Sequence, residues 1–196
     1  MKRARLWLAA LALAGLGWMV MDTSGSRAGE DKAVKAAVVK IAKALEKGDN
    51  SAAATEAKAL AKNLEDLEAI MHLFKPRTKK GLGVGAKAGA ITPDGIELCV
   101  IALDRNGPRA ATFKRDADAY ADMGYTIAAI AEVIQYKPPE KDAGKKTKRE
   151  WLSLSKDMKE GGIRLAEAAR KGPAEVKAAA SKLNNSCNSC HTVFKP

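Results

Sequence analysis

Five residues close to the C-terminus, Cys187-Asn188-Ser189-Cys190-His191, constrain this chain more than any other feature. Two thiols stand three positions apart, and an imidazole follows directly after the second. The whole chain holds only three cysteines and two histidines, and this run uses two of the cysteines and one of the histidines. The run therefore predicts that both thiols and the imidazole act together on one group.

A Cys-x-x-Cys-His run is typical of the attachment site of a c-type haem. Each thiol can add to one vinyl group of the same porphyrin, and the imidazole of His191 can then serve as the proximal ligand of the iron. Two other sites use paired cysteines. A redox dithiol follows a strand, and none is predicted here. A zinc site needs four ligands, and only Cys99 and His72 remain elsewhere in the chain. The run thus favours one covalent haem c, bound through Cys187 and Cys190.

The N-terminus has the layout of a secretory signal peptide. Basic side chains within residues 2–5 precede an apolar run over residues 6–20, and residues 26–28 offer small side chains at the two positions that determine cleavage. We expect residues 1–28 to be removed and residues 29–196 to form one exported, periplasmic domain. An uncleaved membrane anchor is the alternative, although the apolar run is shorter than the roughly 20 residues of a full span.

The chain is basic, with a formal charge of +11. Loss of residues 1–28 would remove four basic side chains and one acidic side chain, which leaves +8. A nucleic-acid partner is not expected for an exported haem protein. One basic cluster, between Lys137 and Arg149, has two interpretations: a docking patch for an acidic redox partner, or an ordinary solvated loop.

Apolar residues recur at helical spacing along the whole domain, and the composition favours helix. A Gly-rich loop over residues 75–92 interrupts the pattern and could fold over one edge of the haem. Gly124 falls on an inward stripe, where a neighbouring helix or the haem can come close. Cys99 lies in an apolar stretch and is predicted to be a buried, inert thiol. The predicted helices cover about 31–47, 51–74, 92–107 (with Thr92 as its cap and Pro93 in its first turn), 109–136, 148–170 and 173–191.

The last predicted helix carries the haem motif. Its inward stripe of Val176, Ala180 and Leu183 continues to Cys187 and then to Cys190 or His191. We therefore expect the haem to be held in the interior, near one end of the helices.

A helical domain with this motif on its last helix resembles the class II cytochromes c, the cytochrome c′ type. The resemblance covers residues 109–196. It implies an all-α, antiparallel four-helix-bundle-type haem domain, here with an additional N-terminal helix and a Gly-rich loop. It also implies thioether bonds at Cys187 and Cys190, His191 as proximal ligand, and a homodimer as one oligomeric state. The family has a single first helix, whereas this chain has two helices and the loop in that region.

The distal ligand stays open between two neighbours, Met71 and His72. Met71 lies on a core stripe and can also be ordinary packing, whereas His72 is turned about 100° away and is expected to face solvent. A His191–Met71 ligand pair would suit one-electron transfer. We therefore expect the protein to be an electron carrier and not an enzyme. The alternatives are a five-coordinate haem that binds small gases, and a peroxidase that would rely on His72 and Arg77.

Overall fold

Helices make up the regular structure of the described chain. The computed structural model describes the backbone of residues 24–194 and the side chains of residues 31–194. Over that stretch the chain is all-α, as predicted, and it forms no strand. The predicted signal peptide lies outside the described residues, apart from residues 24–28 at the start of the first helix. The elements are α1 (Ser24–Glu46), α2 (Asn50–Asn63), α3 (Glu68–His72), the 3-10 turn η1 (Arg77–Lys79), α4 (Ile96–Asn106), α5 (Phe113–Ile134), α6 (Lys148–Ala169) and α7 (Pro173–Phe194).

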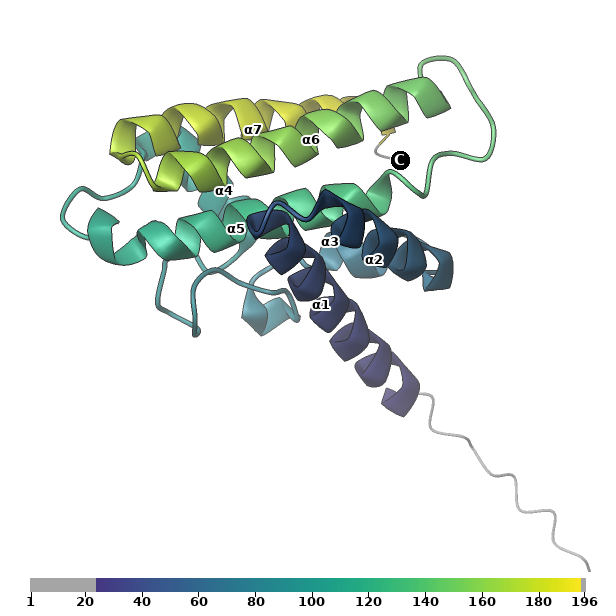
Figure 1. Cartoon of the computed structure of the whole chain (residues 1–196), viewed down its shortest axis with the longest axis horizontal. Coiled ribbons are helices and arrows are strands. Elements are labelled where there is room, and N and C mark those ends of the chain that lie inside the picture. Colours follow the sequence, from purple (N-terminus) through teal and green to yellow (C-terminus); the bar gives the residue numbers. More distant parts are fainter. Residues whose placement is uncertain (1–23, 195–196) are drawn as a thin grey trace, which may run out of the picture.

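The central element is α5, which lies between two groups of helices (Figure 1). It packs against α6 on one side and against α1 and α2 on the other, while α4 packs against α7. The side chains of Ile127, Ile130 and Ile134 are fully buried. Each contributes roughly 1.5–3 kcal/mol through removal of apolar surface from water. The apolar stripes in the sequence predicted α5, α6 and α7 to within a few residues at each end.

Two glycines set the close approach of α5 and α6. A Cβ on Gly124 would lie 2.5 Å from the carbonyl oxygen of Gly162, and a Cβ on Gly162 would lie 2.6 Å from the carbonyl oxygen of Gly124. Neither position accepts a side chain without the helices moving apart. The expectation that a neighbour comes close at Gly124 is confirmed, and that neighbour is α6.

The turn between α6 and α7 is short. The N–H of Gly172 donates to the carbonyl of Ala168 (3.1 Å), which ends α6, and Pro173 begins α7 at once. Proline is tolerated at a first helical position because its missing N–H would have no partner there. The chain therefore turns back, and α7 runs alongside α6 (Figure 1).

The predicted helix over residues 51–74 is wrong, because the chain breaks after Asn63. Leu64 is extended (φ −79°, ψ 132°) and buried. The Lys137 ammonium donates to the Leu64 carbonyl at 2.7 Å, which satisfies an acceptor left free at the end of α2. The Asp66 carboxylate accepts from the N–H of Glu68 at 2.7 Å and starts α3. Hydrogen bonds of the polar side chains Lys137 and Asp66 therefore stabilise the break between α2 and α3.

The predicted start of the helix over residues 92–107 is also wrong, since α4 begins at Ile96 after Gly95. The residues before it belong to the Gly-rich loop. The Asp94 carboxylate pairs with the guanidinium of Arg77 and accepts from the Arg77 backbone N–H at 3.1 Å. Arg77 also donates to the carbonyls of Val84 and Gly85. One ion pair therefore organises the loop across 17 residues of sequence.

The Gly-rich loop does not fold over the Cys-x-x-Cys-His run. Residues 82–91 instead border a groove formed with Val39 of α1 and with Ala119 and Met123 of α5. Gly85 has φ +79°, and a Cβ there would lie 3.3 Å from the Ala90 side chain and 3.7 Å from Ala119. The loop thus packs tightly against α5, away from the residues of the motif.

Candidate functional site

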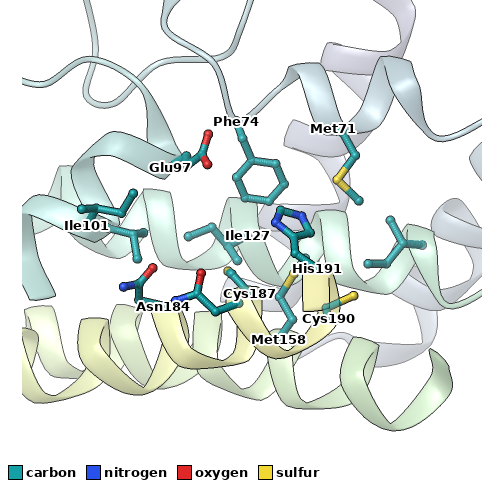
Figure 2. A pocket seen from close by; sticks show the side chains of 13 residues that line it. Met71, Phe74, Glu97, Ile101, Ile127, Met158, Asn184, Cys187, Cys190 and His191 are labelled. Atoms are coloured by element: carbon teal, nitrogen blue, oxygen red, sulfur yellow. The ribbon is translucent and has the colours of Figure 1, made fainter. Parts of the chain in front are cut away.

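Five helices and the residues next to them enclose a cavity of about 250 Å³. Its walls come from segments that are far apart in sequence, and most of the side chains are apolar (Figure 2). A volume of this size is just below the range of about 300–1,000 Å³ typical of small-molecule pockets. The lining residues are Met71, Phe74, Glu97, Val100, Ile101, Ile127, Ile134, Met158, Asn184, Cys187, Asn188, Cys190 and His191.

The complete Cys-x-x-Cys-His run lines this cavity from α7. Val176, Ala180 and Leu183 are buried, as their stripe predicted, and the stripe leads directly to Cys187. Cys187 and Cys190 are half-buried, whereas His191 is exposed at the rim. Of the two predicted continuations of the inward stripe, Cys190 is half-buried and His191 is exposed. The helix nevertheless delivers two thiols and one imidazole to a single cavity.

Burial keeps both thiols protonated in this fold. Burial, with smaller contributions from neighbouring Cys190 and Glu97, raises the pKa of Cys187 to about 11. Burial likewise raises the pKa of Cys190. Redox dithiols need the opposite shift, because the thiolate is the reactive form. Their position at the C-terminal end of α7 also disfavours negative charge. The motif therefore does not have the electrostatics of a thioredoxin-type pair.

The wall opposite α7 is built by α3 and α4. Met71 belongs to α3 and Phe74 follows it, and both are half-buried against the core. The N–H of Glu97 donates to the carbonyl of Phe74 at 3.2 Å. This bond joins the first turn of α4 to the residues that follow α3, although residues 73–95 separate the two helices in sequence. Met71 and His191 thus reach the same cavity from different elements.

Polar groups occupy one side of the cavity. Glu97 of α4 and Asn184 of α7 lie on the same side in Figure 2, and Asn188 of α7 also lines the cavity. The Asn184 amide donates to the Asp104 carboxylate at 2.8 Å, a bond that holds α4 against α7. Asn184 is therefore positioned by a contact outside the cavity.

The sequence did not single out several of these lining residues. Glu97 carried no signal, because its place depends on where the Gly-rich loop sets α4. Met158 is buried on α6, but nothing in its spacing linked it to the motif. Asn184 stands three positions before Cys187, so the helical period alone could have placed it beside the thiol.

His72 and Arg77 lie outside this cavity. His72 lies 3.5 Å from the Glu68 carboxylate and borders a separate surface recess with Glu65. Arg77 is engaged by Asp94 and by carbonyls of the Gly-rich loop. The structure therefore brings Met71 to the motif, and it does not bring His72 or Arg77 there.

The third cysteine is also separate. Cys99 is buried in the core, and burial, followed by the nearby charge of Asp116, raises its pKa to about 12. The prediction of a buried thiol is confirmed. Across residues 31–194 no set of three or more His, Cys, Asp or Glu side chains converges as a metal-ion site.

Comparison with known proteins returns no relative: no family model, no curated protein and no solved structure matches this chain. Among the helices that the structure describes, none combines the length and the apolar character needed to cross a membrane.

Proposed function

We propose that this chain is an exported, monohaem c-type cytochrome that carries single electrons, with haem c bound through Cys187 and Cys190. The observation that supports this most is that both thiols and His191 line one mainly apolar cavity. Signal-peptide removal, a periplasmic location and the class II cytochrome relationship belong to the same proposal. In it, the helices form an antiparallel four-helix-bundle-type haem domain with an additional N-terminal helix and the Gly-rich loop.

The donor set fits a haem. Two thiols can form the thioether bonds, His191 can be the proximal ligand, and Val100, Ile101 and Ile127 supply an apolar wall. The cavity is smaller than most ligand pockets, so the porphyrin must displace side chains. Met71 and Met158 are suited to that adjustment because methionine is unbranched and flexible.

The chain's own residues have distinct roles in this proposal. When bound, the haem iron supplies the one-electron couple. His191 would hold the iron, and Met71 is the other side chain of the cavity that could bind it. The apolar wall would exclude water, which together with the iron ligands would tune the reduction potential.

A gas-binding haem is the second candidate, and one observation favours it. Phe74, Val100, Ile101 and Ile127 line the cavity and cannot coordinate iron. If Met71 stays in the core packing, these side chains would border an open, apolar coordination position that suits a small uncharged gas.

The test is expression of the full chain in a host that attaches c-type haem. We expect a haem signal that survives denaturation, that is lost in the Cys187→Ala/Cys190→Ala double variant and that is kept in the Cys99→Ala control. Low-spin spectra with slow CO binding would support electron transfer, and high-spin spectra with ready CO binding would support gas binding. Absence of covalent haem from the wild-type protein would refute both.

A further inference from the structure

The loop that joins α5 to α6, together with the first turn of α6, carries a group of cationic side chains, which we call the basic loop: Lys141, Lys145, Lys146, Lys148 and Arg149. All five are exposed, and none of them forms an ion pair with another described residue. Some basic residues elsewhere do pair, as Lys159 does with Glu132 and Arg170 with Glu46. The five cationic side chains of the basic loop are therefore free to contact another molecule.

Acidic residues within the loop offset only part of this charge, because two carboxylates stand against five cationic side chains. Glu140 and Asp142 are its carboxylates, and Asp142 accepts from the backbone N–H of Lys148 at 2.8 Å. That bond directs the carboxylate to the backbone rather than to a lysine ammonium.

The basic loop is held in a defined conformation. Ala143 and Lys146 exchange two backbone hydrogen bonds, of 3.0 and 2.9 Å, around Gly144. The Thr147 hydroxyl accepts from the N–H of Glu150 at 3.1 Å and caps α6. A surface that is already ordered loses less conformational entropy when a partner binds. These contacts distinguish the loop from an unstructured charge run.

The basic loop lies at the same end of the helices as the Cys-x-x-Cys-His run. The loop follows directly after Ile134, which lines the cavity, and Trp151 beyond it donates from its indole N–H to the Ile134 carbonyl at 2.7 Å. The Trp151 ring contacts Phe194, three residues after His191. Figure 1 shows the loop and the last turn of α7 together at this end.

Exposed apolar side chains flank the basic loop on both sides in the sequence. Tyr136 precedes it with 37% of its surface exposed, and Leu152 follows it with 47% exposed. Protein interfaces commonly combine aromatic and apolar contacts with a charged rim. Exposed apolar side chains beside cationic ones fit contact with a protein partner better than contact with a partner that is only charged.

We propose that the basic loop is the docking surface for an acidic protein partner that exchanges electrons with the site at Cys187–His191. This inference rests on the proposed haem function and adds the partner's chemistry and its place of contact. Complementary charge accelerates encounter and orients the partner. Docking at this end would bring the partner to the edge of the cavity where the motif lies.

The first test measures how fast the reduced holoprotein is oxidised by the hexacyanoferrate(III) anion. The variant is Lys141→Gln/Lys145→Gln/Lys146→Gln. The matched control is Lys114→Gln/Lys171→Gln/Lys177→Gln, which removes the same charge from exposed positions at the opposite end of the helices (Figure 1). At low ionic strength we expect the loop variant to react about tenfold more slowly and the control less than twofold. The difference should vanish near 1 M salt, where the screening length is about 3 Å. Equal losses in both variants, or no loss in either, would overturn the proposal.

The second test needs no electron transfer and identifies the partner class. Binding to poly-L-glutamate is compared with binding to phosphatidylglycerol vesicles and to duplex DNA at one ionic strength. We expect poly-L-glutamate to bind best, with at least fivefold weaker binding to the loop variant and unchanged binding to the control. Tighter binding to vesicles or DNA would overturn the acidic-protein assignment. If covalent haem were absent, the proposed function would fail, while this test would still decide whether the basic loop binds an acidic polypeptide.

Discussion

Trp151 and Phe194 meet edge to face, with ring centroids 4.9 Å apart and ring planes at 89°. The same indole donates to the Ile134 carbonyl. One side chain therefore ties the start of α6 to the ends of both α5 and α7. This contact closes the end of the molecule where Cys190 and His191 lie.

Replacing Trp151 by Phe keeps an aromatic ring and removes the indole N–H. The Ile134 carbonyl then loses the indole but still accepts from the N–H of Lys137 at 3.0 Å, so we expect the free energy of unfolding to fall by about 0.5–1.5 kcal/mol. Urea unfolding followed by circular dichroism measures this. Leu152→Ala, at an exposed neighbour, should change stability by no more than about 0.5 kcal/mol. An unchanged stability in Trp151→Phe would mean that the indole bond contributes nothing.

Gly124→Ala tests the contact between α5 and α6. Alanine normally stabilises a helix by about 1 kcal/mol relative to glycine. Here the added methyl group would meet the Gly162 carbonyl at 2.5 Å, and overpacking of this kind costs about 1–3 kcal/mol or more. We therefore expect net destabilisation in thermal or urea unfolding. The exposed substitution Ala178→Ser serves as a control, and a stabilised Gly124→Ala protein would show that the helices separate freely.

The two glycines and the stripes of α5, α6 and α7 show what the sequence could predict. Core residues at regular helical spacing, such as Val176 and Leu183, form a pattern within one helix that can be recognised in the sequence. The break after Asn63 left no such pattern, because it depends on Lys137, which lies 73 residues away. Rules based on neighbouring residues do not take into account a hydrogen-bond partner so far away in the sequence.

The candidate site likewise has one part that the sequence predicts and one part that it does not. Cys187, Cys190 and His191 form a local motif, and their shared cavity follows from one helix. Glu97 and Phe74 meet through a backbone bond across the Gly-rich loop, whose course is set by the pair of Arg77 and Asp94. Only a three-dimensional structure reveals that arrangement.

Lys137 has a structural role that separates it from the basic loop. Its ammonium donates to the carbonyls of Leu64 (2.7 Å) and Glu65 (3.3 Å). We expect Lys137→Met to lower the free energy of unfolding by about 1–2 kcal/mol, because hydrogen bonds of charged donors exceed neutral ones and this one is partly exposed to water. Lys141→Met, measured in the same urea titration, should have almost no effect. Equal effects of the two substitutions would contradict the assignment.

Stability should fall in the alkaline range. Burial raises the pKa of Cys99 and of Tyr120 to about 12, from usual values of 9.0 and 10.0. Between these values the unfolded chain releases protons that the folded chain still binds, so the folded state is favoured below about pH 9 and loses stability as the pH rises toward 12. Urea unfolding at a series of pH values measures the slope. Cys99→Ala combined with Tyr120→Phe should flatten it, and an unaltered slope would assign the loss to other groups.

Met71 and His72 are adjacent, yet only Met71 lines the cavity, which makes them a matched pair of substitutions. If Met71 is the distal ligand, Met71→Ala should convert a low-spin spectrum to a high-spin one and speed CO binding. It should also lower the reduction potential on the order of 100 mV, within the ~0.8 V range that axial ligation controls. His72→Ala should leave spectrum and potential unchanged, because the His72 side chain lies beside Glu68. A spectral change in His72→Ala with none in Met71→Ala would instead place the histidine on the iron. Unchanged high-spin spectra in both variants would leave the coordination position open and favour gas binding.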